Sequence, residues 1–313
     1  MNFQKPKFWD YKKPNLLSYF LLPFTFPLIV NNFFLKIKKK NSFHSQIKKI
    51  CVGNIYVGGT GKTPLVIKIY QLLNQLEFKT AVIKKFYKNH IDEQKILANS
   101  TKLYCQKDRV TALNEAIKDS NDIAIFDDGL QDRVINYDLK FVCFNNIKWI
   151  GNGLLIPAGP LREKMKSISK YDAVFINGNE IDCSNLKLLI KRYNNDIKIF
   201  ESHYFPNNID EFDNSQKYII FSAIGNPETF METLIRNKFN IIKEIIFPDH
   251  YSYTQADIDK IKLQAKNLNA KIITTEKDYV KINIKKNNDI KFLKIELKIK
   301  NEEELINYLK LHI

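Results

Sequence analysis

A glycine-rich turn between an apolar run and an amphipathic run constrains the fold of this chain more than any other feature. The turn reads Gly58, Gly59, Thr60, Gly61, Lys62 and Thr63. Glycine lets the backbone approach a phosphate closely, so that N–H groups can donate to it. A Lys can reach the outer phosphates and a Thr hydroxyl can bind Mg²⁺. With an apolar strand expected at 50–55 and Pro64 opening a helix, the segment predicts binding of a nucleoside triphosphate such as ATP.

The turn departs from the common P-loop pattern, which places a Gly five residues before the Gly of Gly-Lys-Thr. That position is Tyr56 here, and Gly58 and Gly59 are expected to provide the bend instead. A similar loop occurs in membrane-associated partitioning ATPases, which carry a Lys where this chain has Val57. A glycine-rich turn without a ligand is the alternative. The order of strand, turn, Lys-Thr and helix favours phosphate binding.

Length and charge narrow the class of protein. The 313 residues suffice for two α/β domains, and 44% hydrophobic residues can form a core. The net charge of +15 favours anionic partners such as nucleic acid, anionic lipid or a phosphorylated substrate, although a lysine-rich coding bias would also raise it. No recognised binding module is present, so we expect no nucleic acid partner. The four cysteines are widely spaced and predict unpaired thiols in a reducing compartment.

The N-terminal region has a different character. Residues 14–35 carry no charge, are rich in aromatic side chains and have lysines on both sides. A spanning helix needs about 20 apolar residues, and Pro23 and Pro27 interrupt this run. We therefore predict that residues 1–40 form a segment that lies in a membrane interface, with its lysines on anionic headgroups. Packing on the protein's own core is the alternative.

Strands that alternate with helices predict an α/β fold with parallel sheets covered on both faces. We expect two α/β/α sandwich lobes, a P-loop NTPase-like lobe at 41–205 and a smaller lobe at 206–313, because residues 205–215 are polar and contain proline. Strands are expected at 50–55, 80–84, 103–106, 122–126, 139–144, 173–177, 198–204, 217–223, 241–247, 271–274 and 292–297. Helices are expected at 65–76, 109–118, 227–238, 254–268 and 302–311.

Two carboxylates end one of the predicted strands. Asp127 and Asp128 follow the apolar run 122–126 and precede a glycine. In P-loop proteins a carboxylate at such a strand end holds the Mg²⁺ that neutralises the phosphates, and Mg²⁺ prefers oxygen ligands. An ordinary Asp-Gly turn is the alternative. Both residues fit a metal site beside Thr63.

Three further residues are candidates for catalysis. Asp92 follows a basic and aromatic stretch, and His250 follows a predicted strand. A carboxylate can take the proton of an attacking hydroxyl, and a nearby His can orient it. Arg162 lies in a turn-rich loop, from which a guanidinium could bind phosphate with two hydrogen bonds. Each of the three would be structural or merely solvated in many proteins.

Taken together, these segments resemble the tetraacyldisaccharide 4′-kinases of lipid A synthesis. The similar segments are 50–64, 127–131, 151–163, 224–227, 249–250 and 275–278, in the family's order. The resemblance implies two lobes that close over ATP and a kinase that phosphorylates the 4′-hydroxyl of a tetraacylated glucosamine disaccharide 1-phosphate. It also implies a peripheral or monotopic enzyme on the cytoplasmic face of a bacterial inner membrane.

The resemblance assigns roles to individual positions. Asp92 would be the base for the hydroxyl, with His250 as its partner from the other lobe. Lys62 and Thr63 match the loop residues, and Asp127 and Asp128 match the carboxylates on the metal side. Two positions depart from the family: Lys85 stands where an Arg is usual, and Asp132 where a His is usual.

A second hypothesis comes from another class of protein. A membrane-associated P-loop ATPase could act as a switch or scaffold through assembly driven by the nucleotide. Val57 in place of that class's signature Lys argues against it. ATP turnover with and without an acylated disaccharide distinguishes the two.

Overall fold

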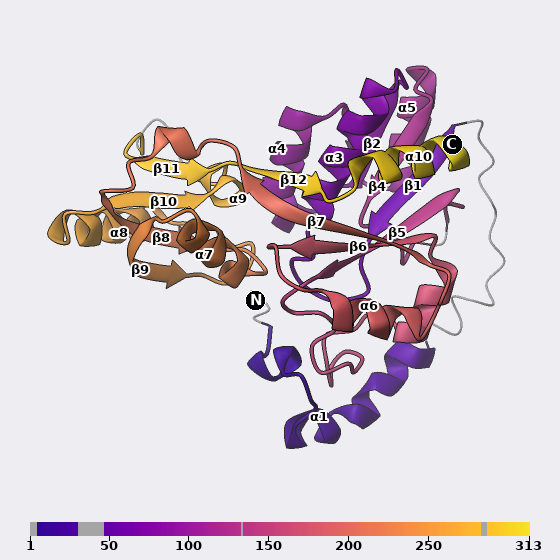
Figure 1. Cartoon of the computed structure of the whole chain (residues 1–313), viewed down its shortest axis with the longest axis horizontal. Helices are drawn as coiled ribbons and strands as arrows, with labels where there is room; N and C mark the ends of the chain where they lie inside the picture. Colours follow the sequence, from indigo (N-terminus) through magenta and orange to yellow (C-terminus); the bar gives the residue numbers. More distant parts are fainter. Residues whose placement is uncertain (1–4, 31–46, 133, 283–286) are drawn as a thin grey trace. The chain divides into compact units, whose positions relative to one another are not determined.

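The structure is a computed structural model that describes residues 5–30, 47–132, 134–282 and 287–313 (Figure 1). Residues 1–4 and 31–40 of the predicted interface segment lie outside the described residues, as does the predicted boundary at 40/41. The described chain folds into two compact units. The first unit comprises residues 5–86, 101–203 and 299–313, and the second comprises 87–100 and 204–298. Each predicted lobe is one continuous stretch of sequence, whereas each of these units contains several separate stretches. The predicted lobe boundaries stay a prediction.

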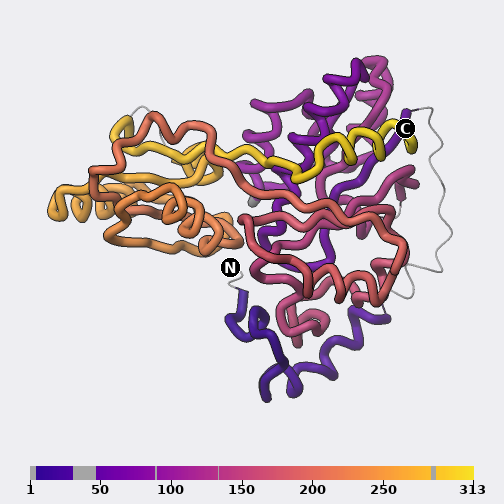
Figure 2. The backbone as a smooth tube through the Cα atoms, in the orientation of Figure 1, coloured from indigo at the N-terminus to yellow at the C-terminus, as the bar shows by residue number. Residues whose placement is uncertain are grey.

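An eight-stranded sheet runs in the order β12-β7-β6-β5-β1-β4-β2-β3. Its seven strands from β7 to β3 pair in parallel, as the alternation of strands and helices predicts. The strands are β1 (Lys48–Gly53), β2 (Thr80–Lys85), β3 (Leu103–Gln106), β4 (Ile123–Asp127), β5 (Leu139–Asn145), β6 (Ala173–Gly178), β7 (Lys198–Pro206) and β12 (Ile295–Ile299). The chain passes between the units at 86/87, at 100/101, within β7 and near the end of β12, and Figure 2 shows the last two passages.

Helices cover both faces of this sheet. Those of the first unit are α1 (Leu16–Phe20), α3 (Lys62–Gln75), α5 (Arg109–Lys118), α6 (Ser184–Lys191) and α10 (Glu302–His312), with 3-10 turns η1 (Lys7–Asp10), η2 (Leu22–Thr25) and η4 (Met165–Lys170). Helices α5 and α6 pack on one face, where Cys51 and Val142 belong to their core clusters. On α10, Tyr308 packs near Phe141 on the other face, and Lys68 of α3 pairs with Glu302.

The second unit contains a smaller parallel sheet in the order β11-β10-β8-β9. Its strands are β8 (Lys217–Ser222), β9 (Asn240–Ile246), β10 (Lys271–Thr275) and β11 (Ile290–Leu293). Its helices are α4 (Ile91–Ser100), α7 (Pro227–Arg236), α8 (Gln255–Asn267) and α9 (Glu276–Tyr279), with 3-10 turns η3 (Lys88–His90) and η5 (Ile209–Glu211). Helix α8 packs with Ile219 and Phe221 on one face, and α7 packs with Tyr218 and Ile220 on the other. This unit is therefore a three-layer α/β/α sandwich.

The single strand predicted at 292–297 is wrong. The chain forms β11 and β12 instead, which end and begin on either side of Lys294 and belong to different sheets. The run is uniformly rich in Ile, Leu and Lys, so its sequence carries no break at that point. The helices α4 and α6 were absent from the predictions. Helix α4 has only a weak helical period of apolar residues, whereas α6 has a clear period but over only eight residues.

The N-terminal segment is anchored to the first unit by polar contacts. The Trp9 indole N–H donates to the carbonyl of Pro157 at 2.9 Å, and the Asn152 amide donates to Ser18 Oγ at 3.0 Å. The Asn15 side chain caps α1 by accepting from the N–H of Ser18. These bonds seat the polar side of the segment on the loop at 151–158.

Burial along this segment is inverted relative to an ordinary surface helix. Ser18 and Thr25 are 0% and 6% exposed, whereas Leu16, Phe20 and Phe26 are 89%, 72% and 67% exposed. Leu17, Tyr19, Leu22 and Phe24 are exposed as well. We call these seven apolar side chains the N-terminal apolar patch. Within the described ranges, no helix has the length and hydrophobicity that crossing a bilayer requires.

Candidate functional site

The glycine loop, residues 54–61, connects β1 to α3 in the first unit. Gly58 and Gly61 have φ angles of 136° and 78°, a region that side chains with a Cβ rarely adopt. Gly61 is the N-cap of α3, which begins at Lys62, three residues earlier than predicted. Lys62 and Thr63 therefore occupy the first turn of a helix of 14 residues, where free backbone N–H groups and the helix dipole favour an anion.

Two asparagines hold the centre of this loop. The Asn54 amide donates to Thr60 Oγ1 at 2.9 Å and to the carbonyl of Gly58 at 3.3 Å. Asn177, at the end of β6, donates to the carbonyl of Thr60 at 2.7 Å. Both amides are fully buried. The loop is therefore held by the side chain of its own first residue and by one side chain of β6. The sequence did not identify Asn177.

The two predicted carboxylates lie beside the loop because β1 and β4 are parallel neighbours. Val52 pairs with Asp127, so both strands end at the same edge of the sheet. Asp128 has a φ of 58° and its carboxylate lies 3.2 Å from Arg162 Nη1 and 4.0 Å from Lys62 Nζ. Asp127 is buried and forms an ion pair with Lys84. Its other oxygen, Oδ1, has no hydrogen-bond partner among the residues that the structure describes.

The turn-rich loop at 151–163 pairs with the glycine loop. The N–H of Val57 donates to the carbonyl of Pro160 at 2.9 Å, and the N–H of Arg162 donates to the carbonyl of Ile55 at 2.7 Å. This backbone pairing carries Arg162 to the same edge as Asp128. The contact explains how two segments a hundred residues apart contribute to one group of side chains.

The departure at Asp132 is compensated within the first unit. Arg109, at the start of α5, lies 2.9 Å from Asp132 and also donates to the carbonyl of Asp128. The carboxylate is thus neutralised by a buried guanidinium instead of facing the loop as a free anion. Arg109 and Lys84 are charged residues near the candidate carboxylates that the sequence analysis did not assign. In the sequence, each is only a basic residue in an apolar strand or at the start of a helix. Such a position is by itself weak evidence for a functional site.

A pocket of about 440 Å³ opens at the same end of the sheet, where β6 and β7 finish. Its polar lining residues include Asn146, Asn179, Glu180, Ser202 and His203. Asn146 donates to the carbonyl of Asn179, so the lining is organised by hydrogen bonds. Ligands of parallel α/β sheets commonly bind at the carboxyl ends of the strands.

In the second unit the structure brings Asp92 and His250 together, although 158 residues separate them. His250 Nδ1 lies 3.1 Å and 3.2 Å from the two oxygens of the Asp92 carboxylate. Asp92 is in the first turn of α4 and is buried, and it accepts a hydrogen bond from the N–H of Glu93. The predicted partner thus lies in the same unit as the predicted base.

Two lysines provide positive charge in this cluster. Lys281 Nζ lies 3.7 Å from the Asp92 carboxylate, and the second lysine is Lys277. Its Nζ lies 3.8 Å from Asp92, 3.4 Å from Glu93 and 3.3 Å from His250 Nε2. Burial raises the pKa of the Asp92 carboxyl, but the hydrogen bond from His250 and the charge of Lys277 outweigh it. The pKa therefore lies below its ordinary value of 3.8. Asp92 is ionised at neutral pH and can accept a proton.

Local capping explains why Lys277 points to this cluster. Thr275 is the N-cap of α9, its side chain accepting from the N–H of Asp278. The buried Asp278 carboxylate accepts from Thr275 Oγ1 at 2.7 Å and from the N–H of Ala223 at 3.0 Å. The Thr-Glu-Lys-Asp motif is thus a helix cap that ties β10 to the end of β8 and fixes the residue between.

The predicted site residues divide between the two units. Gly58 to Thr63, Asp127, Asp128 and Arg162 gather at one sheet edge of the first unit, while Asp92 and His250 pair in the second. The parallel sheet, with a glycine loop between its central strand and α3, defines a P-loop-type α/β protein.

Comparison with known proteins names the family. A family model described as "Tetraacyldisaccharide-1-P 4'-kinase" (LpxK) matches residues 16–313. A tetraacyldisaccharide 4'-kinase of Pelagibacter ubique is 51% identical over 310 residues, covering 99% of this chain and 98% of that protein. One of Rickettsia conorii is 35% identical, with 96% of each chain covered. The chain belongs to the tetraacyldisaccharide 4'-kinase family and is a kinase.

A solved structure agrees on the fold. The crystal structure of "apo" form LpxK from Aquifex aeolicus in complex with ATP has a TM-score of 0.69 with this chain and 22% sequence identity. It covers 95% of this chain and 99% of its own. The predicted α/β fold with a P-loop-like sheet is confirmed.

Proposed function

We propose that this chain transfers the γ-phosphoryl group of ATP to the 4′-hydroxyl of tetraacyldisaccharide 1-phosphate, a step of lipid A biosynthesis. Membership of the family supports the reaction. The observation that carries the chemistry is the buried Asp92 carboxylate, held ionised by His250 and Lys277. Such a group can accept the proton of a hydroxyl at neutral pH.

The glycine loop would bind the triphosphate. Its backbone N–H groups and the start of α3 favour an anion, and Lys62 would add a charge at the outer phosphates. Arg162 already lies beside Asp128 and would bind a phosphate oxygen with its guanidinium. The pocket at the ends of β6 and β7 has room for a nucleoside. Ser202 of its lining donates to Asn177, which in turn donates to the carbonyl of Thr60.

The residues at this edge also fit a magnesium ion. Thr63, Asp127 and Asp128 offer only oxygen donors, and the buried Oδ1 of Asp127 lacks a hydrogen-bond partner among the described residues. Hard oxygen ligands are those that Mg²⁺ prefers. When bound, the ion would neutralise charge on the phosphates, with Thr63 and one or both carboxylates holding it directly or through water.

In the transfer itself, the 4′-oxygen would attack the γ-phosphorus while its proton passes to the Asp92 carboxylate and ADP leaves. His250 donates its Nδ1 proton to Asp92 and thereby orients the carboxylate. Lys277 opposes protonation of Asp92 before the acceptor arrives. Lys62 and Arg162 would stabilise the charge that develops on the transferred group.

The N-terminal apolar patch would hold the enzyme on lipid. Its exposed leucines and aromatic residues form a contiguous stretch of chain whose polar side chains are turned inward. Contiguous exposed apolar side chains mark interaction sites, and an amphipathic segment with flanking lysines suits an anionic bilayer surface. We infer a peripheral or monotopic position on the cytoplasmic face of the inner membrane, where an acylated acceptor can be reached without leaving the bilayer.

The direct test is transfer of label from [γ-³²P]ATP in the presence of Mg²⁺. The acceptor is tetraacyldisaccharide 1-phosphate in mixed micelles, and the control acceptor lacks the 4′-hydroxyl. We expect a labelled lipid only from the first acceptor. ATP hydrolysis that is unaffected by either acceptor, with no labelled lipid, would instead support the switch or scaffold hypothesis.

A further inference from the structure

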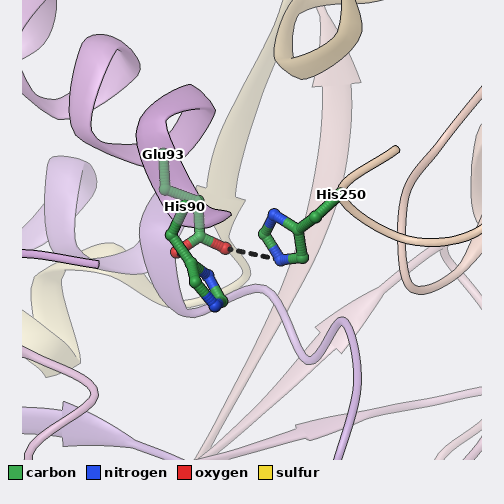
Figure 3. A group of neighbouring side chains, drawn as sticks. All are labelled: His90, Glu93 and His250. Carbon is green, nitrogen blue, oxygen red and sulfur yellow. Dashed lines mark ion pairs between the residues drawn. The ribbon is translucent and has the colours of Figure 1, made fainter. Parts of the chain in front are cut away.

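Two imidazoles and a carboxylate converge in the second unit, and of these three side chains the proposed phosphoryl transfer uses only His250. His90 ends η3, Glu93 lies in the first turn of α4, and His250 follows β9 (Figure 3). Each side chain offers one ligand atom, and the three atoms lie within 4.8 Å of one another. In Figure 3 the Glu93 carboxylate lies close to both rings.

The separations suit a small divalent cation. His90 Nδ1 lies 3.5 Å from Glu93 Oε2, and His250 Nε2 lies 3.8 Å from Glu93 Oε1. Ligands at zinc distances in a tetrahedron are about 3.3 Å apart. The three ligand atoms, which lie within 4.8 Å of one another, would therefore have to close by up to about 1.5 Å on binding. The spacing of His90 and Glu93 by three residues places both on one side of the start of α4.

The surroundings prepare His250 as a ligand. When the Nδ1 proton is donated to Asp92, the lone pair of the neutral ring lies on Nε2, which is 3.8 Å from Glu93 and 3.3 Å from the Lys277 ammonium. A carboxylate behind a histidine is the arrangement that fixes the tautomer and raises the basicity of metal-binding imidazoles. His90 is about two-fifths exposed, so an ion can enter from solvent.

The space between His250 and Glu93 already holds a cation, the ammonium group of Lys277. Its ammonium lies 3.3 Å from His250 Nε2 and 3.4 Å from Glu93 Oε1, between two of the candidate ligands. A divalent ion bound there would have to displace the ammonium. The lysine is therefore a built-in competitor that limits metal affinity.

We propose that His90, Glu93 and His250 form an inhibitory site for divalent transition-metal ions, of which Zn²⁺ is the best match. Two nitrogen donors favour Zn²⁺, Co²⁺ or Ni²⁺ over Mg²⁺, so the site discriminates against the ion that serves the phosphates. Bound metal would take the lone pair of His250 and draw Glu93 and Lys277 from their places around Asp92. The inhibitory effect rests on the proposed function, whereas binding does not.

The test of binding uses Co²⁺ as a spectroscopic probe on the full-length, metal-free protein with excess Mg²⁺. Tetrahedral Co²⁺ with nitrogen ligands gives visible absorption bands, and Zn²⁺ should abolish them by displacement. We expect His90→Asn and Glu93→Gln each to weaken binding by at least about tenfold. His312→Asn removes an exposed histidine of α10 and serves as the matched control, with affinity unchanged.

Lys277→Met provides the sharper test. If the Lys277 ammonium competes with the metal ion, its removal must increase metal affinity. Removal of the ammonium should tighten Co²⁺ binding by about tenfold, equivalent to loss of one competing ion pair. Wild-type affinity in both His90→Asn and Lys277→Met overturns the site. These binding measurements do not depend on kinase activity. Their outcome is therefore independent of whether the proposed function is correct.

Inhibition is tested in the label-transfer assay. Zn²⁺ is added at the concentration that displaces all Co²⁺ from the site in the binding assay. It should suppress label transfer by the wild type. It should not inhibit His90→Asn, which retains Asp92 and His250 but lacks one metal ligand. Equal inhibition of both proteins overturns the inhibitory role, because the metal would then act elsewhere, for example at the phosphates.

Discussion

The glycine loop of the first unit and the Asp92 cluster of the second unit are built in opposite ways. The loop is local: consecutive residues 54–61 form it, and the groups proposed to bind the anion are mostly backbone N–H groups of the loop and of the start of α3. The cluster is assembled from side chains of η3, α4, the turn after β9 and α9. A backbone site depends on glycine at two positions, whereas the cluster depends on the balance of charges around one buried carboxylate.

The glycine loop and the Asp92 cluster should therefore respond differently to substitution. Substitution near the loop should alter the binding of nucleotide, because that is what its N–H groups and Lys62 contact in the proposed function. Substitution in the cluster should alter the chemical step or its pH dependence while the loop remains intact.

Asp92→Ala and His250→Ala should each lower kcat by about 10³-fold, because the proton acceptor or its orienting partner is lost. If the two act together, the double variant should lose far less than the product of the single losses. Steady-state kinetics of the three proteins measure this. Asp210→Asn, an exposed carboxylate of the same unit, is the matched control. A fully multiplicative loss contradicts a coupled pair.

Replacing Leu16, Phe20 and Phe24 by Ser should weaken binding to anionic vesicles by about 100-fold, since each side chain contributes about 1 kcal/mol when half-buried in lipid. All three are exposed, so the free energy of unfolding should change by less than about 0.5 kcal/mol each. Sedimentation with vesicles and thermal denaturation measure the two effects. Leu311→Ser, an exposed leucine on α10, should leave vesicle binding unchanged.

Lys62→Ala should weaken ATP binding by about 30-fold, the loss of one charge-assisted contact to phosphate. Isothermal titration with ATP and Mg²⁺ measures it. Lys79→Ala, an exposed lysine of the same unit, controls for net charge. Unchanged ATP affinity and unchanged kcat in Lys62→Ala would contradict the proposed role of the glycine loop in binding ATP.

Lys277→Met should lower kcat at pH 7 by about tenfold and shift the acid limb of the pH–rate profile. The charge of Lys277 lowers the pKa of Asp92. Without it that pKa rises, and activity is lost at a higher pH as the solution is acidified, because the base must be deprotonated. The pH dependence of kcat/KM measures the shift. A limb that stays in place or moves to lower pH contradicts the role of Lys277.

The first unit could be largely predicted from the sequence. Its strands end in recognisable signals, the glycines at 58–61 and the carboxylates at 127–128, and the parallel order of β1 and β4 brings them together. Arg109 and Lys84 could not be assigned, since each finds its carboxylate only after the sheet has formed. The split of 292–297 between two sheets likewise depends on tertiary pairing.

The second unit was less accessible to sequence reasoning. The helix α4, which carries Asp92, lacks a strong apolar period and was not predicted, and the pairing of Asp92 with His250 came from family resemblance. Lys277 was visible only as one residue of a motif. Its position follows from the cap at Thr275 and the buried bond from Ala223 to Asp278, which no spacing in the sequence reveals.

The most direct measurement compares ATP affinity with single-turnover label transfer in the same preparations of Lys62→Ala and Asp92→Asn. We expect a crossed pattern: Lys62→Ala weakens ATP binding, whereas Asp92→Asn binds ATP within about threefold of the wild type and transfers label about 10³-fold more slowly. Transfer by Asp92→Asn at the wild-type rate would contradict the central claim that this carboxylate accepts the proton of the attacking hydroxyl.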